Sequence, residues 1–146
     1  MPDSRTIFIG SDHAGIDLKN DLLLYLKELG RQIEDCGVFS KESSDYPTIA
    51  YKVCAGVLKK SASGILVCGS GIGMSMAANR CKGIRAALCT HEFHARLSRS
   101  HNDANVLCLG ARVTATALAC ELAKLFLETP FEGGRHERRV ALIDGI

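Results

Sequence analysis

Short, uninterrupted apolar runs alternate with segments of helical periodicity along this chain, and this alternation constrains the fold more than any other feature. The first run, residues 6–10, ends in glycine, and leucines then recur at helical spacing from Leu18 to Leu29. The other expected strands are residues 32–36, 64–68, 84–89 and 106–109, and the other expected helices are residues 47–60, 72–79, 92–100 and 114–128. Continuous apolar runs are typical of parallel strands covered by helices on both faces. The sequence therefore predicts an α/β fold with a five-stranded parallel sheet.

The expected architecture is a three-layer Rossmann-like sandwich in a single domain, residues 1–146, with a C-terminal helical tail. A chain of 146 residues has a common single-domain size. Pro130 and the pair Gly133-Gly134 break the alternation, so residues 131–146 are expected to form an arginine-bearing, helical tail that packs elsewhere. Sheets of this kind bind ligands outside the carboxyl ends of their strands, near the point where the strand order reverses.

Composition and charge exclude several classes of protein. With 47% hydrophobic residues, 23% charged residues and a formal net charge of +2, neither disorder nor a membrane protein is indicated. The basic residues do not form a stripe with aromatic residues, so no nucleic-acid partner is expected. The seven cysteines are odd in number and include no C-x-x-C pair, which indicates reduced thiols. Neither a leader pattern nor an apolar segment of roughly 20 residues is seen. We therefore expect a cytoplasmic protein with no membrane partner.

The strongest local signal is the segment Val-Cys-Gly-Ser-Gly-Ile-Gly at residues 67–73. Cys68 ends a buried strand, and alternating glycines then open a helix. Glycines allow close approach, and the free N–H groups of a helix start favour an anion or a developing negative charge. The same environment favours a thiolate, which can act as a base or a nucleophile. A cysteine at the end of a strand can also belong to the core, but none of the other six is followed by such a loop.

Other glycine-loop chemistries fit this segment poorly. A dinucleotide fingerprint needs a third glycine where Met74 stands, and an acid about 20 residues later, where Cys89 and Thr90 stand. The P-loop motif does not occur in the sequence. A cysteine-phosphatase loop, by family pattern, would need an arginine at position 74. An oxyanion site is the interpretation that remains.

Two further segments carry candidate polar groups. Asp12 and His13 follow the first expected strand and should share the carboxyl edge of the sheet with Cys68, although Asp12 could instead be a helix cap. His101 and Asn102 follow the fourth expected helix, just before the fifth strand, where they could equally be a helix-terminal cation and a turn residue.

The tail adds a pair of arginines. Arg135 and Arg139 are four residues apart and share one face of a helix, whereas Arg138 points away. Two guanidinium groups on one face suit a phosphate dianion, although a solvated charge run is the alternative. His91 and His94 have no third ligand nearby in the sequence and are interpreted as solvated helix residues, so no metal site is expected.

Several segments, in this order and spacing, resemble the type B ribose-5-phosphate isomerases, a family that also contains allose- and galactose-6-phosphate isomerases. The matching segments are residues 10–15, 45–47, 68–73, Arg80, and residues 101–105, 110–113 and 132–136. The resemblance extends from about residue 5 to residue 143. It implies a Rossmann-like homodimer with active sites at the subunit interface and no metal or organic cofactor, and it leaves higher assembly open.

The resemblance also implies roles for individual residues. Cys68 would be the base that moves a proton between C2 and C1, and Ser70 would assist proton exchange on the two oxygens. His101 would open the furanose ring, with Asp12 as a partner. The implied substrate-binding residues are Tyr46, Gly69, Gly71, Ile72, Gly73 and Asn102 for the sugar and enediolate, and His13, Arg112, Arg135 and Arg139 for the phosphate. Another branch of the family carries a glutamate base where this chain has Met74, so the chain resembles the cysteine branch.

The expected reaction is the interconversion of ribose 5-phosphate and ribulose 5-phosphate, a step of the pentose phosphate pathway. An allose- or galactose-6-phosphate isomerase is an alternative, because the depth of pocket that selects sugar length is not readable from one sequence. A hydrolase that uses Cys68 and His101 through a covalent intermediate is a second alternative. A sugar-phosphate sensor is a third.

Overall fold

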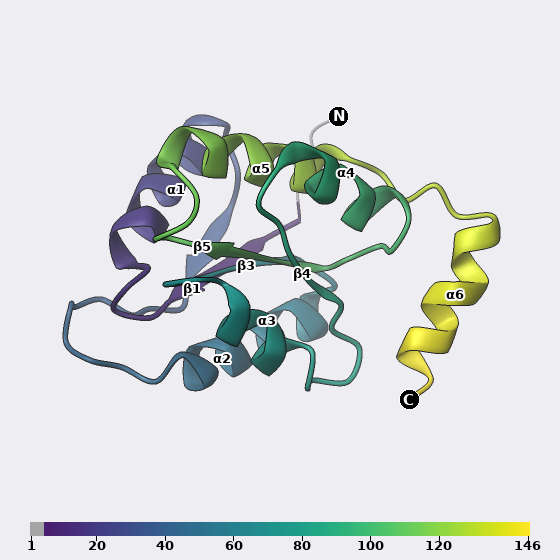
Figure 1. Ribbon diagram of the computed structural model, residues 1–146, viewed down its shortest axis with the longest axis horizontal. Coiled ribbons are helices and arrows are strands. Elements are labelled where there is room, and N and C mark those ends of the chain that lie inside the picture. The colour runs from purple at the N-terminus through teal and green to yellow at the C-terminus, as the bar shows by residue number, and fades with distance from the viewer. Residues whose placement is uncertain (1–4) are drawn as a thin grey trace.

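The computed structural model describes residues 5–146 and shows a parallel sheet between two layers of helices (Figure 1). The strands are β1 (Ile7–Ser11), β2 (Ile33–Asp35), β3 (Ser63–Cys68), β4 (Ala86–Leu88) and β5 (Val106–Gly110). The helices are α1 (Ile16–Glu28), α2 (Tyr46–Lys60), α3 (Ile72–Ala78), α4 (Glu92–Ser100), α5 (Thr116–Glu128) and α6 (Arg135–Asp144). Every expected strand and helix is present, and the predicted fold class is confirmed.

The strands are all parallel, in the order β2-β1-β3-β5-β4. The order reverses between β1 and β3, where Ser11 pairs with Val67 at the carboxyl ends of the two strands. The loops that follow β1 and β3 therefore meet at the switch point, where sheets of this type bind ligands.

The apolar core lies on both faces of the sheet. Successive residues of β1 alternate between the faces: Ile7 and Ile9 belong to one buried cluster, and Phe8 belongs to the other. Figure 1 shows α1, α4 and α5 on one face and α2 and α3 on the other. Because both faces are covered, both sets of side chains are apolar, which explains the continuous apolar runs of the sequence.

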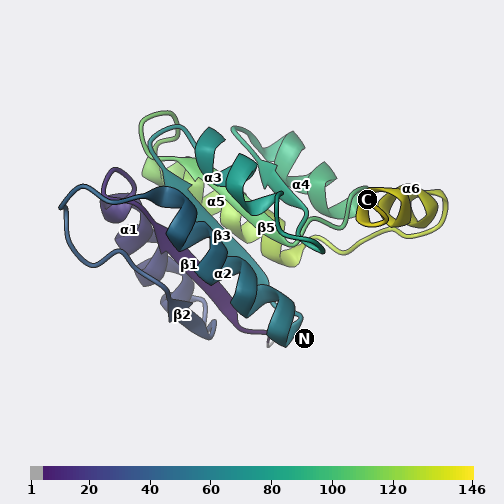
Figure 2. The same ribbon diagram turned by 90° about the horizontal axis from the view of Figure 1, so that it is seen from below.

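Helix α6 lies outside the layers. Figure 2 shows it projecting from one end of the molecule, and in Figure 1 it lies beyond the amino ends of the strands. The Asp144 carboxylate binds the Arg85 guanidinium at 2.8 Å, whereas Leu142 and Ile143 are more than half exposed. The predicted helical tail is thus confirmed.

None of the helices in residues 5–146 has the length and apolar character needed to cross a bilayer.

Candidate active site

The loop after β3 surrounds the Cys68 thiol with amide groups. The Gly71 N–H donates to the Cys68 Sγ at 3.2 Å, and the Ile72 N–H donates to the Ser70 Oγ at 3.2 Å. Within residues 5–146, the N–H groups of Gly69, Ser70 and Gly73 have no acceptor. Amide donors stabilise negative charge on a sulfur or on a substrate oxygen. The loop therefore combines a potential base with donors for an oxyanion.

Close packing against β4 and β5 explains the glycines of this loop. Gly71 has a φ of +81°, and a Cβ built there would lie 2.5 Å from the Leu88 Cδ1 and 3.0 Å from the carbonyl carbon of Leu109. A Cβ built on Gly110 would lie 2.5 Å from the Ser70 carbonyl oxygen. The two 2.5 Å contacts are shorter than real Cβ atoms tolerate. A side chain at position 110 would therefore push against the backbone of the loop that surrounds Cys68, and one at position 71 would require Leu88 to move and would be strained at this positive φ.

Tyr46 and Arg112 lie directly over the loop. A Cβ built on Gly73 would lie 2.6 Å from the Tyr46 Cζ, and one built on Gly69 would lie 3.2 Å from the Arg112 Nη1. The Arg112 N–H also donates to the Gly69 carbonyl oxygen at 2.9 Å. The structure thus brings together a phenol, a guanidinium and a thiol that are far apart in the sequence.

Asp12 and His13 occupy the adjoining loop after β1. The buried Asp12 carboxylate accepts the N–H groups of Ala14 and Gly15 through Oδ1, both at 3.0 Å, so it does organise the start of α1. The His13 Nδ1 accepts the Ser44 N–H at 3.2 Å, and in the neutral ring the proton is therefore on Nε2. Nothing in the sequence pattern pointed to Ser44, which is 31 residues from His13.

The remaining predicted site residues lie towards the opposite end of the sheet, where its strands begin. Gly64 pairs with Val106 where β5 begins, and Cys68 pairs with Gly110 where it ends. Four residue steps along a strand span about 13 Å. His101 precedes β5 and ends α4, and α6 lies beyond the amino ends (Figure 1).

Within one chain the candidates therefore form two groups. We call Asp12, His13, Tyr46, residues 68–73 and Arg112 the thiol half-site. We call His101, Asn102, Arg135 and Arg139 the histidine half-site. Arg135 and Arg139 are exposed, and neither side chain has a hydrogen bond or an ion pair with any residue in 5–146.

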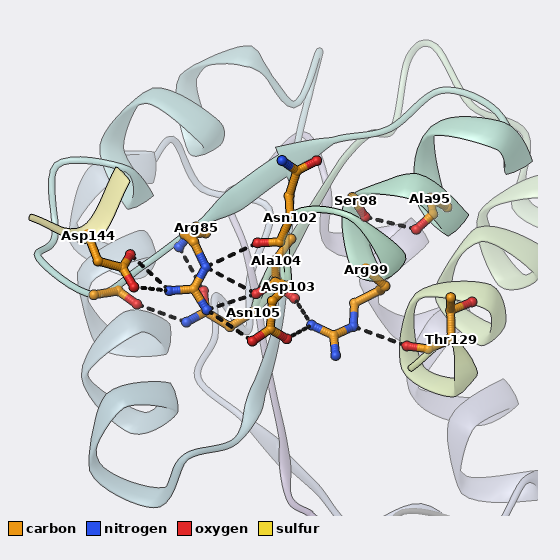
Figure 3. Close-up of polar contacts among 11 residues, drawn as sticks. Arg85, Ala95, Ser98, Arg99, Asn102, Asp103, Ala104, Asn105, Thr129 and Asp144 are labelled. Atoms are coloured by element: carbon orange, nitrogen blue, oxygen red, sulfur yellow. Dashed lines mark hydrogen bonds and ion pairs between the residues drawn. The ribbon is translucent and has the colours of Figure 1, made fainter. Parts of the chain in front are cut away.

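A polar network fixes the segment that carries His101 and Asn102. Figure 3 shows Arg85 and Arg99 approaching Asp103 from two sides, with the Arg99 Nη1 at 2.8 Å from Oδ1 and the Arg85 Nη2 at 3.6 Å from Oδ2. The Asn102 carbonyl oxygen accepts from the Arg85 Nε at 3.2 Å, while its side-chain amide points away from the network. Asn105, in contrast, uses its side chain to hold Arg85 and Gly83 and is a turn residue.

His101 has two neighbours from the tail segment. Its ring stacks on the ring of His136 with 4.2 Å between centroids, and its Nε2 lies 3.8 Å from the Glu132 Oε2. The His136 Nε2 lies 3.6 Å from the same oxygen. Burial lowers the pKa of His136, and the charges of His101 and Arg135 lower it further. The pattern of the sequence gave neither Glu132 nor His136 a role beside His101.

Comparison with known proteins agrees with this geometry. The family model Ribose/Galactose Isomerase matches residues 7–143. The chain belongs to this family. It is 43% identical over 143 residues to ribose-5-phosphate isomerase B of Escherichia coli strain K12, covering 97% of this chain and 96% of the relative. A ribose 5-phosphate isomerase of Thermotoga maritima has a similar structure, with a TM-score of 0.96, 50% identity and coverage of 99% and 100%. The type B ribose 5-phosphate isomerase of Trypanosoma brucei is also similar, with a TM-score of 0.94, 44% identity and coverage of 98% of this chain and 99% of that chain. The resemblance inferred from the motifs is confirmed.

Most of the other thiols in this ribose/galactose isomerase chain are held in their neutral form. Burial raises the pKa of Cys54 to about 12 and that of Cys89 to about 11, and it raises the pKa of Cys108 well above its ordinary value. Burial also raises the pKa of Cys36 and Cys120. These five are poor bases at neutral pH, which supports their interpretation as inert thiols.

Proposed function

We propose that the chain is an aldose-ketose isomerase that interconverts ribose 5-phosphate and ribulose 5-phosphate in the pentose phosphate pathway. The observation that carries this proposal is the Cys68 sulfur at the switch point of the sheet, with the Gly71 N–H donated to it. Relatives named ribose-5-phosphate isomerase B support the choice of substrate, since they align over nearly the whole chain.

The reaction requires a base and stabilisation of an enediolate. In the proposed mechanism His101 opens the furanose ring, with Asp12 as its partner. The Cys68 thiolate then removes the C2 proton and returns it to C1, while Ser70 exchanges protons on the two oxygens. The free amides of the loop hold the negative charge of the enediolate. One such donor lowers the barrier by about 3 kcal/mol, and a positioned base raises the rate by about 10²- to 10⁴-fold.

The non-reacting phosphate supplies binding energy at the far end of the sugar. The proposed phosphate ligands are His13 and Arg112 from the thiol half-site and Arg135 and Arg139 from the histidine half-site. The His13 Nε2–H is available as a donor, because Nδ1 is already bonded to Ser44. Holding the phosphate fixes C2 near Cys68, which converts binding energy into rate. Tyr46 and Asn102 are proposed to contact the sugar oxygens.

A homodimer with its active sites between the subunits follows from the two half-sites. Because they lie at opposite edges of one sheet, one chain cannot bring Cys68 and His101 to the same sugar. A two-fold arrangement solves this, since each copy can supply its thiol half-site to the histidine half-site of the other. The projecting α6, with Leu142 and Ile143 exposed, is suited to such a contact. Seven unpaired cysteines support a reducing, cytoplasmic location.

A comparison of kcat/KM for ribose 5-phosphate, allose 6-phosphate and galactose 6-phosphate tests the substrate. Cys68→Ala is expected to lower turnover of the best substrate by about 10²- to 10⁴-fold with the fold intact. Cys120→Ala is the matched control, because it removes a partly buried thiol on α5. Near-normal turnover of Cys68→Ala would refute the base. Release of inorganic phosphate, or a thiol adduct seen by mass spectrometry, would instead support the hydrolase.

A further inference from the structure

Three potential metal ligands converge beside α6, away from the thiol half-site of the same chain. The ligating atoms of His101, Glu132 and His136 all lie within 4.8 Å of one another. The Glu132 Oε2 is 3.8 Å from the His101 Nε2 and 3.6 Å from the His136 Nε2. The three side chains range from buried His136 to largely exposed Glu132, so the cluster is open to solvent on the carboxylate side.

The backbone of the tail creates this convergence. The Glu132 N–H donates to the Ser100 carbonyl oxygen at 3.0 Å, which fixes the tail against the end of α4. Gly133 and Gly134 then adopt φ values of +69° and +57° and turn the chain into α6. Positive φ values are accessible to glycine at little cost. The turn brings His136 back beside Glu132 and stacks its ring on that of His101.

Two of the three separations, those from Glu132 to each histidine, are close to those of a zinc site. Zinc binds imidazole nitrogen at about 2.0–2.1 Å and carboxylate oxygen at about 2.0–2.2 Å, so tetrahedral ligand atoms lie about 3.3 Å apart. The two measured nitrogen–oxygen distances exceed this by a few tenths of an ångström, and Glu132 is 59% exposed and able to move.

We infer that His101, Glu132 and His136 form a Zn²⁺ site whose occupancy inhibits the enzyme. The metal would take the Nε2 of His101, the ring nitrogen that faces Glu132, and would withdraw this histidine from proton transfer to the sugar. Two histidines and a carboxylate leave a further position for water, as in other open zinc sites. Binding of the metal stands on the geometry alone, whereas inhibition rests on the proposed function.

Direct binding tests the site without reference to activity. Zn²⁺ is titrated into the full chain in competition with a chromophoric chelator, and the wild type is expected to bind one ion per chain in this site. Glu132→Gln keeps the shape of the side chain, and His136→Ala removes a ring. Each is expected to weaken Zn²⁺ binding at least about 10- to 100-fold, since loss of an outer-shell partner already has that effect.

Two control variants test whether Zn²⁺ binds elsewhere on the chain. His94→Ala alters the second stacked histidine pair, His91 and His94, which has 4.0 Å between centroids and no third ligand among residues 5–146. Cys68→Ala removes the thiol of the proposed base. Both are expected to bind Zn²⁺ as the wild type does. Wild-type affinity in Glu132→Gln and His136→Ala, or loss of binding in Cys68→Ala, would overturn the site.

An activity measurement then tests the inhibition. Zn²⁺ should inhibit the isomerisation of ribose 5-phosphate by the wild type, and EDTA should restore it. His136→Ala should need at least about 10-fold more Zn²⁺ for half inhibition. Full wild-type activity with the site occupied would overturn the inhibition while leaving the site in place. If the wild type does not turn over ribose 5-phosphate at all, the proposed function fails and the binding titration still decides the metal site.

Discussion

Mixed dimers of two inactive variants provide the sharpest test of the two half-sites. Cys68→Ala damages the thiol half-site, and His101→Ala damages the histidine half-site. If each active site combines half-sites from two chains, a mixed dimer contains one intact site and one site with both defects. Neither parent homodimer contains an intact site. Co-expression of the two variants should therefore restore activity that neither has alone.

The size of the restoration follows from the geometry. Random assortment makes half of the dimers mixed, and half of the sites in a mixed dimer are intact, so about 25% of wild-type kcat per site is expected. Mixed dimers purified through two different affinity tags should reach about 50%. These values hold only if His101 cannot serve the Cys68 of its own chain. The two half-sites lie at opposite ends of β5, a strand about 13 Å long, and this placement supports that condition.

The assay is the initial rate of ribulose 5-phosphate formation at saturating ribose 5-phosphate, with the residual rates of both parents subtracted. Cys68→Ala paired with Ser70→Ala is the matched control. Both changes lie in the thiol half-site, so a mixed dimer of these chains has no intact site and should gain nothing. A rate no greater than the sum of the two parents, in purified Cys68→Ala and His101→Ala mixed dimers, would refute the shared site.

Three further predictions concern the scaffold. Lys19→Met removes the cation that binds the Asp35 carboxylate at 2.9 Å and should lower the free energy of unfolding in urea by about 3 kcal/mol, whereas a loss below about 1 kcal/mol would contradict a buried ion pair. Gly71→Ala places a Cβ against the backbone of β5 at a φ of +81°, which costs about 1–2 kcal/mol. In steady-state kinetics of Gly71→Ala, kcat should change by a larger factor than KM, and an unchanged kcat would exclude a role for the loop in catalysis. Stability should fall as the pH rises from about 9 towards 12, because the unfolded chain releases thiol protons that folded Cys54 and Cys89 retain. Each of these two thiols should lower the free energy of unfolding by about 1 kcal/mol at pH 10. Thermal melts of Cys89→Ala should therefore show a Tm that falls less steeply with pH than that of the wild type.

The pattern of the sequence was sufficient for the elements of the fold but not for their order. Continuous apolar runs identify buried parallel strands in any arrangement, and they do not show that β5 lies between β3 and β4. The strand expected at residues 84–89 is only Ala86–Leu88 in the structure. It lies at the edge of the sheet, where the preceding Arg85 peptide N–H is held by the side chain of Asn105.

The thiol half-site was more accessible to prediction than the histidine half-site. Asp12, His13 and Cys68 follow strands of one parallel sheet, so a shared edge was expected and is observed. The separation of His101 from Cys68 also had a signal in the sequence, because a residue that precedes a strand lies at the amino edge. The contact of His101 with His136 had none, since 35 residues and a glycine turn separate the two rings.

Lys19 shows how a periodic pattern can hide a residue that supports the site. It lies three residues before Leu22 and seven before Leu26, on the apolar face of α1, and its side chain is fully buried. A buried ammonium group requires partners, and the structure supplies Asp35 and the Val38 carbonyl oxygen, at 2.9 and 2.6 Å. These contacts hold the start of the segment between β2 and α2, whose far end carries Ser44 against His13 and then Tyr46 over the glycine loop. A charge on the apolar face of a helix was therefore a readable sign of a fixed loop, and that loop positions two proposed substrate ligands.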